Sequence, residues 1–238
     1  MADRHRPHGH LTFPVMGPVR ASVLMTAWNA ERFIGEAIAS VLAQTRPPDQ
    51  VVVNDDGSTD GTRDVLAGFG AAITVLASPH QGTSAGRNRA LEVADGDVLA
   101  FLDADDLWLP AKLEHQLAAL AGDAELDAVF SATDEFIDAR GAPRTRPPRA
   151  GAVGPLPSAL AIRRHAAARV GPFRPDVPVG DWIDWWSRAM QSGVRWRHDP
   201  QVLVRRRLHA DNNSVRHAGE NAVYLDIVRQ RLAERRGS

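Results

Sequence analysis

Residues 97–114, DVLAFLDADDLWLPAKLE, decide the fold more than any other stretch of the chain. The largely apolar run at 97–102 predicts a buried strand, and a cluster of acids follows it at 103–106. A helix is predicted over 110–121, because proline is well tolerated in the first turn of a helix. A strand that passes through a polar turn into a helix is the repeating unit of an α/β sheet.

The same unit occurs three times upstream. We expect strands over 22–26, 51–53 and 72–76, and helices over 31–44, 62–69 and 83–94. Asp60 is a candidate N-cap for the second of these helices. The strands are continuous apolar runs, and such strands are usually buried on both faces of a parallel sheet. The predicted fold class is therefore α/β, with a Rossmann-like, mostly parallel central sheet flanked by helices.

The second half of the chain is less regular and predicts a smaller lobe. Its expected elements are a strand over 128–137, a basic loop over 139–157, an aromatic helix at about 180–192, a strand over 202–208 and a charged helix at about 219–236. No internal repeat or clean linker divides the chain. We therefore expect a flexible tail over 1–18 and a single domain of two lobes over 19–238.

Composition excludes several classes of protein. The chain has 238 residues, 44% of them hydrophobic, and a formal net charge of −1, which argues against a general nucleic-acid-binding protein. It has no cysteine, so disulfide frameworks, zinc-thiolate sites and cysteine nucleophiles are excluded. No apolar run approaches the ~20 residues that span a bilayer, and the N-terminal residues make a poor signal peptide. A cytoplasmic protein is expected, with peripheral membrane contact left open.

Two acid clusters follow predicted strands, one at Asp55 and Asp56 and the other at 103–106. Ligands of open α/β sheets bind beyond the carboxyl ends of the strands, so both clusters are expected to share one site. Asp103 and Asp105 could together face Mg²⁺ or Mn²⁺ on a diphosphate, because phosphate and water supply the remaining ligands. The alternative is an acidic loop that caps the following helix.

The first acid cluster, within NDDGSTDG at 54–61, has three interpretations. It is a simple turn, or a site where a carboxylate accepts a hydrogen bond from a base N–H or a ribose hydroxyl. A phosphatase of the haloacid-dehalogenase type would need an aspartate nucleophile where Asn54 stands, and an amide cannot attack phosphorus as a carboxylate does. The P-loop motif and the G-x-G-x-x-G fingerprint of dinucleotide-binding folds are both missing from the sequence.

The order of motifs resembles the nucleotide-sugar half of family-2 glycosyltransferases with the GT-A fold. The resemblance covers residues 20–120 and is carried by SVLMTAWNAERFIGEAIASVLAQT, VVVNDDGSTDGT, GTSAGRNRAL and DVLAFLDADDLWLPAKLE, in this order and at this spacing. Later, VGPFRPDVPVGDWIDWWSRAMQSG and RRLHADNNS are similar to the acceptor-side and late histidine segments of the same family. The resemblance implies a nucleotide-sugar-binding half over 19–125, and an acceptor-binding half with the C-terminal helix over 126–238.

The resemblance also implies a role for each matching residue. The residues expected to bind the nucleotide are Thr26, Ala27, Asn29, Asp55, Arg87, Asp103 and Ala104. Asp55 would accept from the base, Arg87 would lie near the base or a phosphate, and Asp103 would hold the ribose or a metal-bound water. Asp105 and His209 would hold the metal ion, Mn²⁺ or Mg²⁺. A surface arginine and a structural histidine are the alternatives for Arg87 and His209.

An inverting transfer needs a base that takes the proton of the acceptor. The family often carries a Glu-Asp pair before an aromatic helix, and here Asp181 matches the Glu while Trp182 replaces the Asp. Asp181 is the first candidate base and Asp184 the second, and Asp181 could also cap the helix. Core packing is expected for at least one of Trp182, Trp185 and Trp186, while another could stack on a sugar or an aromatic acceptor.

The predicted function is metal-assisted, inverting transfer of a sugar from a nucleoside-diphosphate sugar, expected to be a UDP-sugar, to a hydroxyl acceptor. That acceptor would be a glycan, a lipid-linked glycan, a small molecule or a peptide, and a homodimer is left open. The alternative is a non-catalytic nucleotide-sugar-binding protein of the same fold, because the acidic pair is broken at Trp182.

Overall fold

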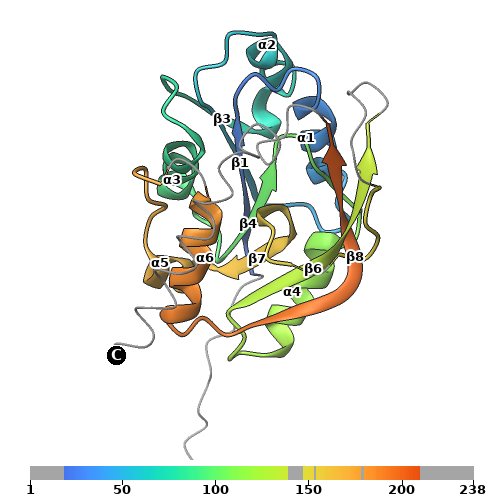
Figure 1. Ribbon diagram of the computed structural model, residues 1–238, viewed down its shortest axis with the longest axis vertical. Helices are drawn as coiled ribbons and strands as arrows, with labels where there is room; N and C mark the ends of the chain where they lie inside the picture. The colour runs from blue at the N-terminus through green and yellow to red at the C-terminus, as the bar shows by residue number, and fades with distance from the viewer. Residues whose placement is uncertain (1–18, 139–146, 153, 178–179, 210–238) are drawn as a thin grey trace, which may run out of the picture.

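The computed structural model describes residues 19–138, 147–152, 154–177 and 180–209 (Figure 1). The expected tail over 1–18, the charged helix at 219–236 and part of the basic loop at 139–157 lie outside the described residues.

Strands and helices alternate along the chain. The strands are β1 (Ala21–Ala27), β2 (Gln50–Asp55), β3 (Thr74–Ala77), β4 (Val98–Asp103), β5 (Leu107–Trp108), β6 (Ala128–Ile137), β7 (Leu160–Arg163) and β8 (Trp196–Leu208). The α-helices are α1 (Ile34–Leu42), α2 (Thr62–Ala67), α3 (Thr83–Val93), α4 (Lys112–Gly122), α5 (Arg164–Val170) and α6 (Asp181–Gln191). Two short 3₁₀ helices, η1 (Gly70–Ala72) and η2 (Pro157–Ala159), complete the described elements.

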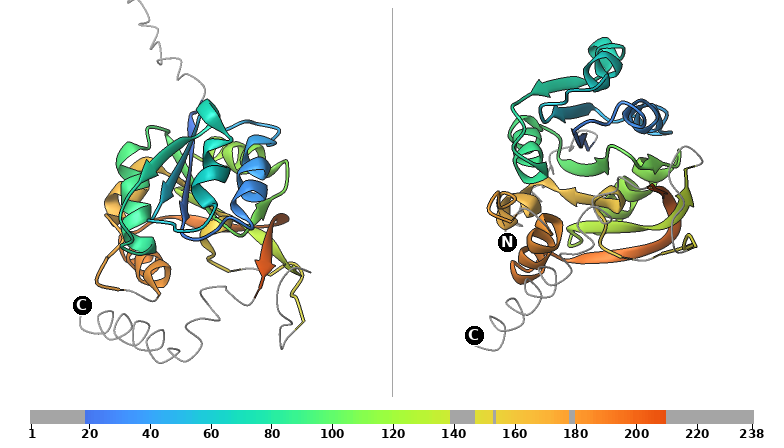
Figure 2. Two further views of the ribbon diagram at one scale, coloured as in Figure 1. Left: turned by 90° about the horizontal axis from the view of Figure 1, so that it is seen from above. Right: turned by 45° about the horizontal axis from the view of Figure 1, so that its top comes forward.

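The strands form one curled, mixed sheet in the order β3-β2-β1-β4-β7-β6-β8-β5. Strands β3, β2, β1 and β4 are parallel, as predicted for the first half of the chain. Strand β7 runs antiparallel to β4 and to β6, and β8 runs parallel to β6. Helices α3, α5 and α6 lie along one side of the sheet, and α1 and α4 lie along the other (Figures 1 and 2). The predicted α/β fold class, with a mostly parallel central sheet flanked by helices, is confirmed.

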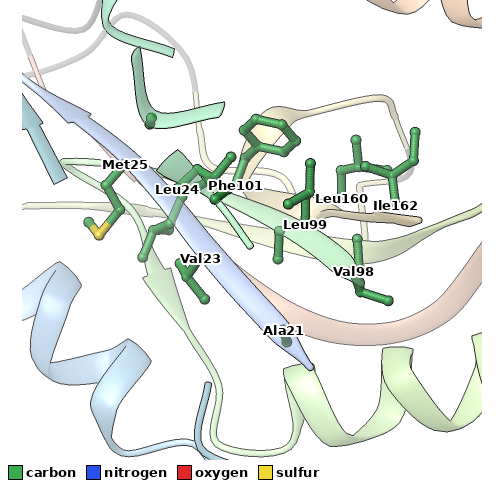
Figure 3. Packing of buried hydrophobic residues seen from close by; sticks show 14 of the residues in the cluster. Ala21, Val23, Leu24, Met25, Val98, Leu99, Phe101, Leu160 and Ile162 are labelled. Atoms are coloured by element: carbon green, nitrogen blue, oxygen red, sulfur yellow. The ribbon is translucent and has the colours of Figure 1, made fainter. Parts of the chain in front are cut away.

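The core is built on the adjacent strands β1, β4 and β7 of the sheet (Figure 3). Every residue of β1 except Thr26 is buried, and so is every residue of β4 except Asp103. Both strands have helices on each side, so they have no solvent face and need no polar alternation. The continuous apolar runs in the sequence follow from this position. Among the described residues, no helix is long and apolar enough to cross a membrane.

Several element boundaries differ from the prediction. The third strand begins at Thr74 rather than at residue 72, because Gly70–Ala72 form a 3₁₀ helix. The last strand begins at Trp196 rather than at residue 202, since β8 passes Pro200 through an irregular register against β6. Proline is tolerated within a strand at such irregularities, and its presence concealed the first half of β8.

Candidate active site

The carboxyl ends of β2, β1 and β4 lie at one edge of the sheet and carry both acid clusters. The strand register places Ala27 beside Asp55 and Thr26 beside Asp103. Side chains alternate between the two faces along a strand, so Thr26 and Asp103 share one face while Ala27 and Asp55 share the other. The two acid clusters therefore occupy one edge, as predicted, but Asp55 and Asp103 point to opposite sides of the sheet.

Asp55 is fully buried and already has two donors. Its Oδ1 accepts from the backbone N–H of Ser58 at 3.1 Å, and its Oδ2 accepts from Nε of Arg63 at 2.6 Å. Burial raises the pKa of the Asp55 carboxyl, but the hydrogen bonds from Arg63 and Ser58 outweigh burial and lower it. Asp55 is therefore held as a carboxylate. A base N–H would have to share it with Arg63, whose side chain is 59% exposed.

The residues around Asp55 shape the loops at this edge. Asp56 accepts from the backbone N–H groups of Gln81 and Gly82, at 2.9 and 2.8 Å, and so fixes the entry to α3. Ser58 Oγ accepts from the N–H of Asn29 at 2.9 Å, and Asn29 has a positive φ of 48°, which asparagine tolerates better than most residues. Asp56 and Ser58 therefore shape the loops at this edge, which agrees with the turn interpretation of residues 54–61.

Thr26 and Ala27 lie at the end of β1, directly beneath α3. Ala27 is fully buried, and Thr26 Oγ1 is buried without a hydrogen-bond partner in the described part of the chain. Gly86 of α3 passes so close that a Cβ there would lie 2.4 Å from Cγ2 of Thr26. The N-terminal part of α3 therefore sits directly on the ends of β1 and β2.

Arg87 of α3 connects the two halves of the chain. Its guanidinium binds Oδ2 of Asp181 at 2.6 Å and Oδ1 of Asp103 at 3.0 Å, and it lies over the rings of Phe173 and Trp182. Burial lowers the pKa of Arg87, but the charges of Asp181 and Asp103 outweigh burial and raise it. Arg87 is thus a buried, permanently charged link, and the alternative of a surface arginine is wrong.

The Asp103 carboxyl is affected by the same group of charges. Burial raises its pKa, Arg87 opposes this effect, and the charges of Asp105 and Asp181 add to it.

Asp181 is not the N-cap of α6, because Gly180 occupies that position and α6 has no side-chain cap hydrogen bond. The carboxylate of Asp181 is instead directed to Arg87.

The two predicted metal ligands lie together. Nε2 of His209 is 2.9 Å from Oδ2 of Asp105, and the His209 ring packs on Phe33 with 4.5 Å between the ring centroids. Within the described residues, no group of three or more His, Asp or Glu side chains is arranged to hold a metal ion. A carboxylate and an imidazole fit a divalent ion that takes its other ligands from phosphate and water. Asp105 and His209 therefore fit the implied metal as a two-ligand site.

Three further residues of this region were not predicted as functional: Asp106, Ser158 and Arg207. Asp106 is buried, and it accepts from Oγ of Ser158 at 2.6 Å and from the N–H of Arg207 at 3.0 Å. Burial, together with the charges of Asp105 and Asp103, raises the pKa of Asp106 well above its ordinary value. Arg207 is buried as well, with only 2% of its side chain exposed. In the sequence, the only sign of this buried cluster is Asp106 itself, the third acid of the 103–106 cluster.

The second candidate base, Asp184, lies within α6 and is buried. Its Oδ2 accepts from Nε of Arg188 at 3.0 Å, and the same guanidinium donates to the carbonyl oxygens of Val170 and Pro172. Asp184 thus orders the side chain that ties α6 to the end of α5. This geometry gives it a structural role.

The three tryptophans of α6 are all buried, so none offers an exposed face to a sugar. Nε1 of Trp182 donates to the carbonyl of Pro155 at 2.5 Å, and Nε1 of Trp185 donates to that of Gly171 at 2.9 Å. Trp186 packs edge-on against Phe130. The expectation that one of them stacks on an acceptor is therefore not met in this structure, and all three serve the core.

Comparison with known proteins identifies the family of this chain. A family model described as glycosyl transferase family 2 matches residues 22–164, more than half of the chain. The chain belongs to glycosyl transferase family 2. The matched range begins in β1 and ends at the first residue of α5, so it includes both acid clusters of this family-2 chain.

Individual relatives support the same assignment. An uncharacterized glycosyltransferase of Nostoc sp. is 32% identical over 185 residues, which cover 70% of this chain and 57% of that protein. The Escherichia coli UDP-Glc:alpha-D-GlcNAc-diphosphoundecaprenol beta-1,3-glucosyltransferase WfgD is 41% identical over 101 residues, which cover 42% of this chain and 40% of WfgD. This family-2 chain therefore spans about half the length of the curated relatives it matches.

A solved structure has the same fold. The crystal structure of S. aureus TarS 1–349 in complex with UDP-GlcNAc superposes with a TM-score of 0.66 and 21% sequence identity, over 80% of this chain and 59% of that one. At this identity the likeness shows the GT-A fold alone. In this family-2 chain, that fold brings Arg87, Asp103 and Asp181 into one ion-paired group and places Asp105 and His209 within hydrogen-bonding distance of each other.

Proposed function

We propose that the chain transfers a sugar from a UDP-sugar to a hydroxyl acceptor, with inversion and with a divalent metal ion. The observation that carries this proposal is the convergence of acidic groups from both halves of the chain. Asp103 at the end of β4 and Asp181 at the start of α6 bind the same guanidinium of Arg87. A donor held at the sheet edge would therefore have the candidate base within the same group of side chains.

The UDP donor is supported by two of the compared proteins. WfgD is named for its UDP-Glc donor, and the TarS structure contains UDP-GlcNAc. Under this proposal Asp55 accepts from the base, Thr26, Ala27 and Asn29 line the base pocket, and Arg87, Asp103 and Ala104 face the ribose and diphosphate. WfgD matches less than half of this chain, so only the UDP donor is carried over from it. The acceptor is proposed only as a hydroxyl compound.

Asp105 and His209 would hold the metal ion. When bound, the ion supplies Lewis-acid stabilisation of the departing nucleoside diphosphate. Because Mg²⁺ prefers an all-oxygen shell, the imidazole of His209 favours Mn²⁺ over Mg²⁺. Both residues lie close to the end of a strand, since Asp105 is two residues after β4 and His209 directly follows β8.

Asp181 is the proposed base. As the acceptor oxygen forms its bond to the anomeric carbon, the bond from that carbon to the diphosphate oxygen breaks and its electron pair leaves with UDP. Asp181 takes the proton of the acceptor hydroxyl, a role that contributes roughly 10²- to 10⁴-fold in such reactions. Arg87 orients this carboxylate through Oδ2. Asp184 is the weaker candidate because it is buried in its pair with Arg188.

Two variants separate these roles. Asp181→Asn is expected to reduce turnover by roughly 10² or more while UDP binding is retained, because the amide cannot accept the proton. Asp184→Asn is expected to lower the melting temperature, with a smaller effect on turnover. The measurement is release of UDP from a panel of UDP-sugars with Mn²⁺ and acceptor, with the anomeric configuration of the product determined by NMR. Full activity of Asp181→Asn would remove the base assignment.

The alternative, a non-catalytic nucleotide-sugar-binding protein, is kept because Trp182 stands where the family often carries an acid. Trp182 is buried and its indole N–H donates to the carbonyl of Pro155; an indole N–H is a donor only and cannot take up a proton as a carboxylate does. Donor binding without transfer or hydrolysis, across a broad panel of acceptors, would favour this alternative. Peripheral membrane contact, a cytoplasmic location and a homodimer stay predictions.

A further inference from the structure

Behind the proposed metal ligands lies a buried polar cluster made of Asp106, Ser158 and Arg207. These residues come from three separate parts of the chain: the turn after β4, the short helix η2 and the end of β8. Each side chain is almost completely withdrawn from solvent. Buried charged groups are costly unless they are paired and hydrogen-bonded. The hydrogen bonds of this cluster therefore show which groups it keeps in place.

The bonds of this cluster converge on the turn that carries Asp105. Ser158 Oγ accepts from the backbone N–H of Asp103 at 3.2 Å and donates to Oδ2 of Asp106 at 2.6 Å. Arg207 donates through its backbone N–H to Oδ1 of Asp106 at 3.0 Å, and through Nε to the carbonyl oxygen of Asp105 at 2.9 Å. The backbone on both sides of Ala104 is therefore held by side chains from the other half of the chain.

The same arginine also anchors the second metal ligand. Arg207 is two residues before His209, and its guanidinium binds Oε2 of Glu36 on α1 at 2.5 Å and the carboxylate of Asp138 just beyond β6. One side chain thus ties down the main chain next to His209 and the carbonyl of Asp105. These are the two residues whose side chains meet at 2.9 Å.

We infer that Ser158, Asp106 and Arg207 are positioning residues that hold Asp105 and His209 at the spacing a divalent cation requires. The inference rests on the proposed function. With two proposed ligands among the described residues, the affinity for the ion depends strongly on how little these side chains must be ordered when it binds. Outer-shell partners of metal ligands commonly change metal affinity about 10- to 100-fold when they are removed.

Ser158→Ala is the sharpest test, because it removes one hydroxyl that bonds to two of these groups. Ser131→Ala is the matched control, since Ser131 on β6 is equally buried and its Oγ lacks a hydrogen-bond partner among the described residues. The measurement is the Mn²⁺ affinity of the full chain at saturating UDP, from the electron paramagnetic resonance signal of free Mn²⁺. We expect affinity to fall about tenfold in Ser158→Ala and less than twofold in Ser131→Ala.

Asp106→Asn provides a second variant if Ser158→Ala does not fold. The amide keeps the shape of the side chain and an oxygen that accepts from Arg207, and a similar loss of Mn²⁺ affinity is expected. A merely structural role would lower the melting temperature and leave the Mn²⁺ affinity unchanged. Wild-type Mn²⁺ affinity in a folded Ser158→Ala or Asp106→Asn variant would overturn the inference alone. Absence of Mn²⁺ binding in the wild-type chain with UDP would instead overturn the proposed function, and the inference with it.

Discussion

Replacing Arg87 by methionine removes the cation that links the two halves of the chain. The guanidinium binds Oδ2 of Asp181 at 2.6 Å and Oδ1 of Asp103 at 3.0 Å, with Phe173 and Trp182 beneath it. Methionine keeps much of the side-chain volume but none of the charge. Two carboxylates are then left near each other without a partner.

The cost follows from how deeply these groups are buried. Removing one partner of a fully buried ion pair costs about 3–5 kcal/mol, because an uncompensated charge stays behind. The side chains of Arg87 and Asp181 are 9% and 17% exposed, but that of Asp103 is 42% exposed, so water relieves part of the loss. We expect Arg87→Met to lower the free energy of unfolding by about 2–4 kcal/mol at neutral pH.

This loss is expected to depend on pH with a definite sign. The pKa of Asp103 is already raised in the folded chain, by partial burial and by the charges of Asp105 and Asp181, and the charge of Arg87 opposes that rise. Without Arg87 the folded-state pKa rises further above the unfolded value. The folded chain then holds more protons than the unfolded chain between those two pKa values, so stability falls as pH rises through that window. The destabilisation by Arg87→Met is therefore larger at pH 7.5 than at pH 4.5.

Urea unfolding followed by tryptophan fluorescence measures this difference at both pH values. Arg89→Met is the matched control on the same helix, because the Arg89 side chain is 29% exposed and lies 4.0 Å from Asp56. This pair lies at the outer limit of an ion pair, and without it Asp56 keeps its hydrogen bonds from the N–H groups of Gln81 and Gly82, so we expect Arg89→Met to cost about 1 kcal/mol or less. The account of Arg87 as a buried link is refuted if Arg87→Met costs no more than Arg89→Met, or if its cost is the same at pH 4.5 and pH 7.5.

Two further predictions concern the core. Burial lowers the pKa of Lys112 in the folded chain well below its ordinary value. Between the folded-state pKa and that ordinary value, the unfolded chain binds a proton that the folded chain does not. The free energy of unfolding therefore rises with pH in this range, by up to about 1.4 kcal/mol per pH unit. Lys112→Met should remove that slope in urea unfolding at pH 7, 8 and 9, and an unchanged slope would contradict it. Gly86→Ala places a Cβ 2.4 Å from Cγ2 of Thr26 and should cost about 1–3 kcal/mol in thermal unfolding, whereas Gly122→Ala meets nothing within 4 Å and should be close to neutral; equal effects would disprove the close approach of α3.

The sequence predicted most of the first half of the sheet because β1, β2 and β4 are buried on both faces, whereas the edge strand β3 is mostly exposed. Strands β1, β2 and β4 are continuous apolar runs, and no other short element gives this pattern as clearly. Strand β5 has only two residues and makes no pattern, and Pro200 concealed the first half of β8. The misplaced boundaries therefore lie where strands are short, irregular or at the edge of the sheet.

The site was predictable where residues are close in sequence or belong to a family motif. Asp105 and His209 are 104 positions apart, yet the motifs that carry them correctly implied that they meet. No comparable signal marks Ser158, which bonds to Asp106 from 52 positions away, because buried serines occur throughout ordinary cores. The sequence also contained no sign of the link between Arg87 and Asp181. Helix α3 has no clear apolar face that would mark Arg87 as buried.

Asp105 and His209 are proposed to form a metal-dependent site for a UDP-sugar. Isothermal titration of UDP into the wild-type chain, with Mn²⁺ and with EDTA, and into Asp105→Asn with Mn²⁺, tests it most directly. We predict measurable UDP binding with Mn²⁺ that weakens at least about tenfold in EDTA and in Asp105→Asn, because each change removes the ion that joins the diphosphate to the chain. UDP binding of equal strength in all three titrations, or no UDP binding in any of them, would contradict the claim.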